Sequence, residues 1–223
     1  MNKNSVSERA AAEAAVPSGK NAVGTYAAAK RAMDVLFSVI ALILLCIPML
    51  LISLLIRIDA RDKAIFTQKR VGRDEKVFEC YKFRTMKREA PRYCAKKDLA
   101  DADAFITRTG RFLRKTSLDE LPQLWNVLKG DMSFIGPRPL IREEVSVHEM
   151  RRACGVYRVR PGISGYAQIN GRDMISDERK VELDKYYLDH FSFALDVRIL
   201  FGTVLKVLKK QDIHQGALEA PDK

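Results

Sequence analysis

An apolar stretch near the N-terminus constrains the fold more than any other feature. Residues 35–56, VLFSVIALILLCIPMLLISLLI, contain no charged side chain. As one helix this stretch would be roughly 33 Å long, which is enough to cross the hydrocarbon core of a bilayer. Pro48 lies inside it and predicts a break, because proline has no amide hydrogen and its ring collides with the preceding helical turn. The stretch therefore predicts a membrane helix that is broken near Pro48.

Basic residues flank this stretch on both sides, with Lys30 and Arg31 before it and Arg57 after it. A helix that spans the bilayer normally has its excess of Lys and Arg on one side only. Cations on both flanks favour a re-entrant helix pair that enters and leaves by the cytoplasmic face, anchored by Lys30, Arg31 and Pro48. A spanning helix is the alternative. The backbone groups freed at the bend need partners within the protein, for which Ser53 is a candidate.

The rest of the chain is expected to be mainly α-helical with one small β-hairpin, and it divides into four parts. Residues 1–29 are expected to be a disordered tail, 30–60 the re-entrant helix pair, 61–210 a cytosolic globular domain and 211–223 a C-terminal tail. Short helices are predicted over 140–155 and 176–193. A basic amphipathic helix over 194–210 is typical of a membrane surface, although a packed core helix with a solvated Lys face would show the same pattern.

The net charge of +11 favours anionic partners, which could be nucleic acid, an anionic membrane surface or phosphorylated substrates. The cysteines and histidines are scattered and have no metal-ligand spacing; they are Cys46, Cys80, Cys94, Cys154, His148, His190 and His214. This scatter argues against a disulfide framework, a His-based metal site and a Ser-His-Asp triad.

The hairpin is predicted over residues 64–86, where two alternating apolar runs surround the polar turn at 72–75. Lys82 and Arg84 alternate with aromatic residues, so both cations would face one way in a strand. They could bind phosphate or could form a solvated strand face.

The stretch RKTSLDELPQLWNVLKGDMSFIGPRP, residues 114–139, places Asp119 and Glu120 side by side at the start of a predicted helix. Ser117 and Glu120 have the spacing of a capping box, and Pro122 fits the first helical turn. The positive end of the helix dipole would favour ionised carboxylates there and could also hold a phosphate. The other interpretation is that these side chains only cap the helix.

This predicted helix carries one apolar face and ends at Gly130. The face repeats at helical spacing through Leu121, Leu124, Trp125 and Leu128. Arg138 follows between two prolines in a stiff loop. Residues 157–172 form a second, glycine-containing basic loop with Arg160, and a loop of this kind can approach phosphates closely, although it matches no Walker or dinucleotide motif.

An acidic pair without a histidine partner can still perform phosphoryl chemistry. An Asp carboxylate can attack phosphorus, and a neighbouring Glu could hold Mg²⁺ against the phosphates. Together with the apolar stretch and the basic loops, Asp119 and Glu120 indicate phosphoryl transfer at a membrane surface.

Five stretches resemble the small monotopic phosphoglycosyl transferases of the bacterial sugar transferase family. They are the basic and apolar start at Lys30, FTQKRVGRDEKVFECYKFRTM, RTGRFLRKTSLDELPQLWNVLKGDMSFIGPRPL, VRPGISGYAQINGR and ELDKYYLDHFSFALDVRILF, and together they cover most of the chain from 30 to 210. Within the family the chain resembles most closely the short enzymes that load N,N′-diacetylbacillosamine phosphate. Relatives often have Ser before the proline of the break, where this chain has Ile47.

This resemblance implies a two-step reaction at the cytoplasmic face of the bacterial inner membrane. Asp119 would attack the sugar-bearing phosphate of a UDP-sugar, with an N-acetylated sugar favoured, and release UMP. Undecaprenyl phosphate would then take the phosphosugar and give an undecaprenyl-diphosphate sugar for glycoconjugate or polysaccharide synthesis. Glu120 would assist and bind Mg²⁺. The implied phosphate-binding cations are Arg114, Arg138, Lys82 and Arg84.

A membrane-tethered scaffold or nucleic-acid-binding protein is the alternative class, because it too would use a large positive charge. Nucleic-acid binders usually pair their basic residues with a reading motif. The sequence contains none that we recognise, so the enzyme is the favoured interpretation.

Overall fold

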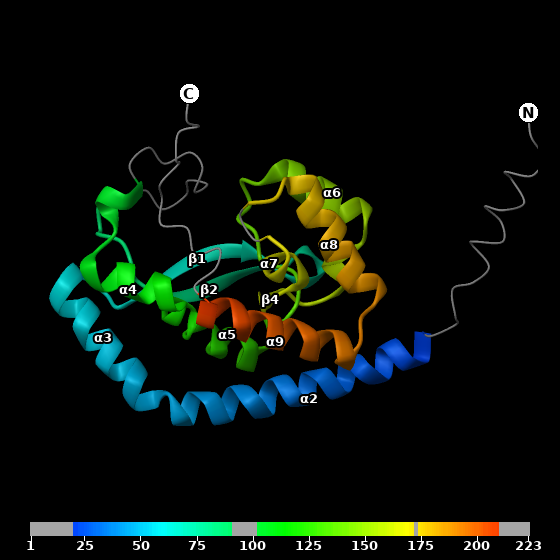
Figure 1. The fold of residues 1–223 in the computed structure, drawn as a ribbon, viewed down its shortest axis with the longest axis horizontal. Coiled ribbons are helices and arrows are strands. Elements are labelled where there is room, and N and C mark those ends of the chain that lie inside the picture. Colours follow the sequence, from blue (N-terminus) through cyan, green and yellow to red (C-terminus); the bar gives the residue numbers. More distant parts are fainter. Residues whose placement is uncertain (1–19, 91–101, 172–173, 210–223) are drawn as a thin grey trace, which may run out of the picture.

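A computed structural model describes residues 20–90, 102–171 and 174–209 (Figure 1). The expected C-terminal tail over 211–223 lies outside the described residues, as do residues 1–19 of the tail expected over 1–29. The helices are α2 (Lys20–Leu44), α3 (Cys46–Ala60), α4 (Arg108–Thr116), α5 (Gln123–Lys129), α6 (Val145–Ala153), α7 (Tyr166–Ile169), α8 (Asp177–Asp189) and α9 (Phe193–Lys209). The strands are β1 (Ile65–Val71), β2 (Val77–Phe83), β3 (Ser133–Ile135) and β4 (Gly162–Ser164). The fold is therefore mainly helical with a small hairpin, as predicted.

The long helix α2 underlies one side of the molecule, and α3 turns away from its end (Figure 1). Helix α5 packs against α2 on one side and against β2 on the other. Helices α6 and α8 pack together at the opposite side of the hairpin from α2 (Figure 1). The α2 helix begins ten residues before the start expected at residue 30.

The predicted break in the apolar stretch is confirmed, and it lies at Leu45, between two helices bent by 62°. Pro48 is the third residue of α3 and sets this position, because its ring would collide with the carbonyl of Leu44 in a continuous helix. Ser53 does not serve the bend. Its hydroxyl donates instead to the Met49 carbonyl within α3, at 2.7 Å.

No single helix among the described residues is long and apolar enough to cross a bilayer. The bent pair Tyr26–Leu44 and Cys46–Ala60 does meet that test of length and composition when its halves are taken together. Large apolar side chains are exposed along it, namely Leu36, Phe37, Val39, Ile40, Ile43, Leu44, Ile47, Leu50, Leu51, Leu54, Leu55 and Ile58.

Charged residues at the start of the apolar stretch fasten α2 to the rest of the protein. Lys30 is buried and its Nζ contacts Asp196 Oδ2 on α9 at 2.5 Å. Arg31 donates to the carbonyls of Val127 and Leu128 at the end of α5, at 2.6 and 2.9 Å. These two cations, expected to anchor the helix in the membrane, thus bind within the protein.

The predicted hairpin is confirmed. Strands β1 and β2 pair antiparallel from Ile65–Phe83 to Val71–Val77. The basic loop expected over 157–172 contains more regular structure than predicted, because β4 pairs parallel with β3 and α7 follows it. This pairing brings Gly136 and Gly162 so close that a Cβ added at Gly162 would lie 2.1 Å from the Gly136 nitrogen. Glycine is what permits that approach.

Buried apolar clusters join these elements. One contains Ile56, Phe83 and Leu113 and joins α3, β2 and α4. A second contains Cys80, Val127 and Met132 and fixes α5 against β2. The hairpin and the chain on either side of α5 are therefore held in one packed unit, which fixes the position of the acidic pair.

Candidate active site

The acidic pair lies on a tight turn between α4 and α5. Helix α4 ends at Thr116, its C-cap Ser117 has a left-handed φ of 57°, and Leu118–Glu120 form a single 3₁₀ turn. The predicted capping box is wrong, because the Ser117 side chain makes no capping hydrogen bond. The predicted helix start is also wrong, since α5 begins at Gln123 with Pro122 as its N-cap. Asp119 and Glu120 therefore precede α5.

The predicted apolar face of this helix is only partly correct. Leu124 is buried, whereas Trp125 is 52% exposed. Helix α5 is rotated so that the polar residues Gln123 and Asn126 face the interior. The predicted end at Gly130 is confirmed, with a φ of 95° that glycine tolerates.

Helix α4 brings Arg114 to the acidic pair by packing closely against the chain that follows β2. A Cβ at Gly110 would lie 2.0 Å from the Thr85 carbonyl oxygen, so only glycine fits there. Arg114 Nε donates to Thr85 Oγ1 at 2.9 Å. The guanidinium is then close enough to Asp119 to lower the pKa of that carboxyl.

Glu120 is surrounded by cations from two other segments. Its Oε1 accepts a hydrogen bond from Lys82 Nζ on β2 at 2.7 Å. Arg138 Nη1, from the proline-flanked loop, lies 3.5 Å from the same oxygen. The Glu120 side chain is 13% exposed, so water screens these contacts only weakly.

Asp119 has a raised pKa. Burial is the largest cause, and repulsion from Glu120 adds to it. Three cations, Lys82, Arg114 and Arg138, act in the opposite direction and lower the pKa. A carboxylate in such an environment is poorly solvated but surrounded by positive charge, which suits a nucleophile that approaches a phosphate.

Four of the predicted site residues thus gather around Asp119, and two lie elsewhere. Arg84 is buried, its Nε donates to the Lys63 carbonyl at 2.9 Å and its Nη2 lies 3.4 Å from Asp62. Arg160 Nε donates to the Gly130 carbonyl at 2.9 Å. Gly130 follows the C-terminal end of α5, whereas the acidic pair precedes its N-terminal end, so Arg160 binds at the other end of this helix from Asp119.

The sequence reasoning missed Asn126, which fastens α5 to the strand that carries Lys82. Its Nδ2 donates to the Glu79 carbonyl at 2.6 Å, and its Oδ1 accepts from the Tyr81 amide at 2.9 Å. The side chain is fully buried. The available signal was an amide flanked by apolar residues within a short helix, because a buried side-chain amide usually hydrogen-bonds to the backbone.

The two carboxylates fit a magnesium site in which the phosphates of the substrate complete the coordination of the ion. Among the described residues no group of three or more His, Cys, Asp or Glu side chains could hold a metal. Mg²⁺ in phosphoryl-transfer sites is commonly bound by one or two carboxylates together with substrate phosphates. Asp119 and Glu120 supply two adjacent carboxylates, and their mutual repulsion would be relieved by a cation.

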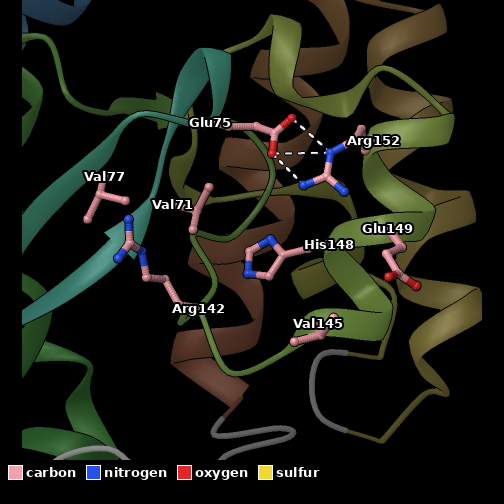
Figure 2. A pocket seen from close by; sticks show the side chains of 8 residues that line it. All are labelled: Val71, Glu75, Val77, Arg142, Val145, His148, Glu149 and Arg152. Carbon is pink, nitrogen blue, oxygen red and sulfur yellow. Dashed lines mark hydrogen bonds and ion pairs between the residues drawn. The ribbon is translucent and has the colours of Figure 1, made fainter.

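A cavity of about 290 Å³ lies between the hairpin turn and α6 (Figure 2). It is lined by Val71, Glu75, Val77, Arg142, Val145, His148, Glu149 and Arg152. None of these residues belongs to the group around Asp119. Glu75 and Arg152 close one side of it with a two-pronged ion pair (Figure 2).

Comparison with known proteins finds a matching family and several similar proteins. The sequence model of a family described as bacterial sugar transferase matches residues 25–210. An uncharacterized sugar transferase, EpsL, of Bacillus subtilis is 43% identical over 186 residues, which are 83% of this chain and 90% of the relative.

Two further relatives have names that state an activity. The UDP-N-acetylgalactosamine-undecaprenyl-phosphate N-acetylgalactosaminephosphotransferase of Aeromonas hydrophila is 43% identical over 188 residues, 82% of this chain and 44% of the relative. The undecaprenyl-phosphate glucose phosphotransferase of Komagataeibacter xylinus is 38% identical over 185 residues, 78% of this chain and 35% of the relative. This chain thus spans less than half the length of each. These names do not support the expected specialisation for N,N′-diacetylbacillosamine.

Proposed function

The chain belongs to the bacterial sugar transferase family, and on this premise we propose that it transfers a sugar 1-phosphate from a UDP-sugar to undecaprenyl phosphate. The names of the Aeromonas and Komagataeibacter relatives support this reaction, since both state a sugar phosphotransferase that acts on undecaprenyl phosphate. An N-acetylated sugar is the first donor to test, because the Aeromonas relative is named for UDP-N-acetylgalactosamine.

The observation that carries the proposal is the half-buried carboxylate of Asp119 beside Glu120, within the field of three cations. A diphosphate ester brings negative charge, and Lys82, Arg114 and Arg138 are placed to receive it. Their positive charge is present before substrate arrives, so little reorganisation is needed as the transition state forms.

In the first step an Asp119 carboxylate oxygen attacks the phosphorus that bears the sugar. A bond forms between this oxygen and phosphorus, and the phosphoanhydride bond breaks. UMP leaves with the electron pair of that bond. The product is a phosphosugar held on Asp119 as an acyl phosphate, a type of intermediate that aspartyl-phosphate enzymes also use.

In the second step a phosphate oxygen of undecaprenyl phosphate attacks the same phosphorus. A new phosphoanhydride bond forms, the bond to Asp119 breaks, and the carboxylate is released unchanged. The lipid leaves as the undecaprenyl-diphosphate sugar. No side chain other than Asp119 needs to form a covalent bond in either step.

Mg²⁺ would be held by Glu120 together with the phosphates of the substrate, and it would neutralise charge on the reacting phosphate. The chain's own cations have separate tasks. Lys82 orients Glu120 through the hydrogen bond of 2.7 Å from its Nζ, and Arg138 approaches the same carboxylate from the proline-flanked loop. Arg114 is held by Thr85 beside the nucleophile.

The acceptor's long prenyl chain stays in the bilayer, so the nucleophile must lie near the lipid headgroups. The exposed apolar residues of α2 and α3 support insertion of the bent pair from one face of the membrane. Exposed Leu200, Phe201 and Val204 on α9 support an interfacial position for that helix. Arg57 in the last turn of α3 and Arg61 and Lys63 after it are exposed, and they would meet headgroups on the cytoplasmic side of the inner membrane.

The chemistry is tested by incubating the purified protein in detergent with a UDP-sugar alone and measuring its intact mass. We expect a mass gain of one sugar phosphate, UMP release, and mapping of the adduct to Asp119. Asp119→Asn is expected to form no adduct. If product forms after lipid is added but no adduct appears at any time with donor alone, the two-step mechanism is refuted.

Membrane topology is tested separately by labelling single cysteines placed before Lys30 and after Arg57, in a chain whose native cysteines have been replaced. A re-entrant pair makes both positions reactive from the same face of sealed vesicles. Labelling from opposite faces would instead show that the pair spans the bilayer.

A further inference from the structure

The loop that carries Arg138 has every backbone carbonyl from residue 137 to 141 in a hydrogen bond. The Gly162 amide donates to the Pro137 carbonyl at 2.9 Å, and the Val71 amide donates to the Leu140 carbonyl at 2.9 Å. The other three carbonyls are bound by side chains. A loop whose carbonyls are all held has little freedom to move.

Three side chains, Arg70, His148 and Arg151, bind these remaining carbonyls, and we call them the carbonyl clamp. Arg151 Nη1 donates to the Arg138 carbonyl at 2.8 Å, and Arg70 Nη1 donates to the Pro139 carbonyl at 3.1 Å. His148 Nε2 lies 2.8 Å from the Ile141 carbonyl and must donate to it, because a carbonyl only accepts. Tyr157 contacts the other ring nitrogen of His148.

The clamp residues come from two elements, α6 and β1. His148 and Arg151 are one turn apart on α6, so they lie on the same face of that helix. Their target carbonyls, at 138 and 141, are three residues apart in the loop. Arg70 comes from β1, and burial, followed by repulsion from Arg138, lowers the pKa of its guanidinium.

Arg151 is itself held by a buried carboxylate. Its Nη2 contacts Asp184 Oδ2 on α8 at 2.5 Å, and the two side chains are 5% and 1% exposed. Two atoms of the pair, Arg151 Nε and Asp184 Oδ1, have no hydrogen-bond partner among the described residues. A buried ion pair with unsatisfied atoms is a poor source of stability, which points to another role.

Arg138 has a backbone that makes such external support necessary. Pro137 and Pro139 have no amide hydrogen, so neither can donate a backbone hydrogen bond to a neighbouring segment. The side chain of Arg138 is 34% exposed and lies 3.5 Å from Glu120. A shift of its backbone would therefore move a charged group within the site.

We propose that Arg151, held by Asp184, is a positioning residue that fixes Arg138 for phosphate binding. The chain of contacts runs from Asp184 on α8, through Arg151 on α6, to the backbone of Arg138 and then to Glu120. This inference rests on the proposed function, because it gives Arg138 a role towards the substrate phosphates. A misplacement of about 1 Å can cost a reaction roughly a hundredfold.

The test replaces the buried pair with apolar residues in the double variant Arg151→Met, Asp184→Leu. Removing one partner alone would leave an unpaired buried charge, whereas replacing both is often tolerated by the fold. We expect kcat/KM for the UDP-sugar to fall about ten- to one-hundredfold, with little change in Tm. If this variant does not fold, Arg151→Lys is tested instead, because Lys keeps the ion pair with Asp184 but cannot also bind the Arg138 carbonyl. The same fall in kcat/KM is expected.

The deciding measurement repeats the double substitution in an Arg138→Ala background and follows single-turnover UMP release. A positioning role predicts no further loss there, because the group that is positioned has been removed. A general structural role predicts the same fold-loss in both backgrounds. The matched control is the exposed ion pair between Glu75 in the hairpin turn and Arg152 on α6, next to Arg151 (Figure 2). In the control both residues are replaced by Gln. It is expected to keep wild-type activity.

The outcomes separate the two proposals. Wild-type kcat/KM in the folded double variant, or equal losses in both backgrounds, overturns the positioning role and leaves the proposed function intact. Absence of UMP release from every UDP-sugar by the wild-type protein overturns both.

Discussion

Replacing Asn126 by Leu should destabilise the protein and disturb the active site together. The Leu side chain is similar in volume but cannot replace the hydrogen bonds to the Glu79 carbonyl and the Tyr81 amide. Both backbone groups face a fully buried side chain, so water does not replace the lost partner. Each buried polar group left without a partner costs about 1–3 kcal/mol.

The two unsatisfied groups predict a loss of about 2–6 kcal/mol in the free energy of unfolding. For a chain of this size that corresponds to a fall in Tm of roughly 4 °C or more. Activity should fall further than the folded fraction explains, because Tyr81 precedes Lys82, whose ammonium group orients Glu120.

The assay compares thermal unfolding in detergent with UMP release at a temperature where every variant remains folded. Asn170→Leu is the matched control, since Asn170 is exposed and its Nδ2 donates to the Tyr166 carbonyl four residues earlier, at 2.7 Å. A fall in Tm for Asn126→Leu no larger than that for Asn170→Leu would refute the reasoning, and α5 would then be held to β2 by apolar packing alone.

Three further predictions concern the turn that carries the acidic pair. Asp119→Asn should abolish turnover and raise Tm at pH 7.5, because the pKa of this carboxyl is raised in the folded protein and its ionisation therefore costs stability as pH rises. The gain in Tm should shrink as pH falls towards 4. An unchanged or lower Tm at pH 7.5 contradicts this. Lys82→Met should move the acid limb of the pH profile of residual kcat/KM to higher pH, because Lys82 lowers the pKa of Asp119, and a limb that stays in place or moves down counts against that role. Ser117 has a left-handed φ of 57°, so Ser117→Gly should keep or raise Tm, whereas Ser117→Val should lower the free energy of unfolding by about 1–2 kcal/mol. If the Gly variant loses as much stability as the Val variant, the capping interpretation is restored.

Residues whose effect on the backbone is local were read correctly from the sequence. Pro48 predicted the break, the polar turn at 72–75 predicted the hairpin and Gly130 predicted the end of α5, and the structure confirms all three. The start of α5 was predicted wrongly. The sequence has the spacing of a capping box, but Ser117 closes α4 in a left-handed conformation that spacing alone does not reveal.

Periodicity predicted which segments are helical better than it predicted which faces are buried. Trp125 fits an apolar face by spacing, but α5 is rotated so that Asn126 meets the unpaired edge of β2. The ends of the apolar stretch show the same limit. Lys30 and Arg31 were predicted as basic flanks of the membrane helix, and their partners within the protein, Asp196 and the α5 carbonyls, could not be read from the sequence.

The sequence by itself determined the bent apolar pair, the hairpin, the presence of an acidic pair and the cations that accompany it. These features follow from properties of individual residues that do not depend on distant parts of the chain, such as the ring of Pro48 or the charge of Asp119. Only the tertiary structure decided which cations reach the pair. Lys82 and Arg138 meet Glu120, whereas Arg84 and Arg160 do not, because a long side chain binds whichever carbonyl or carboxylate the packing of distant segments places within its reach.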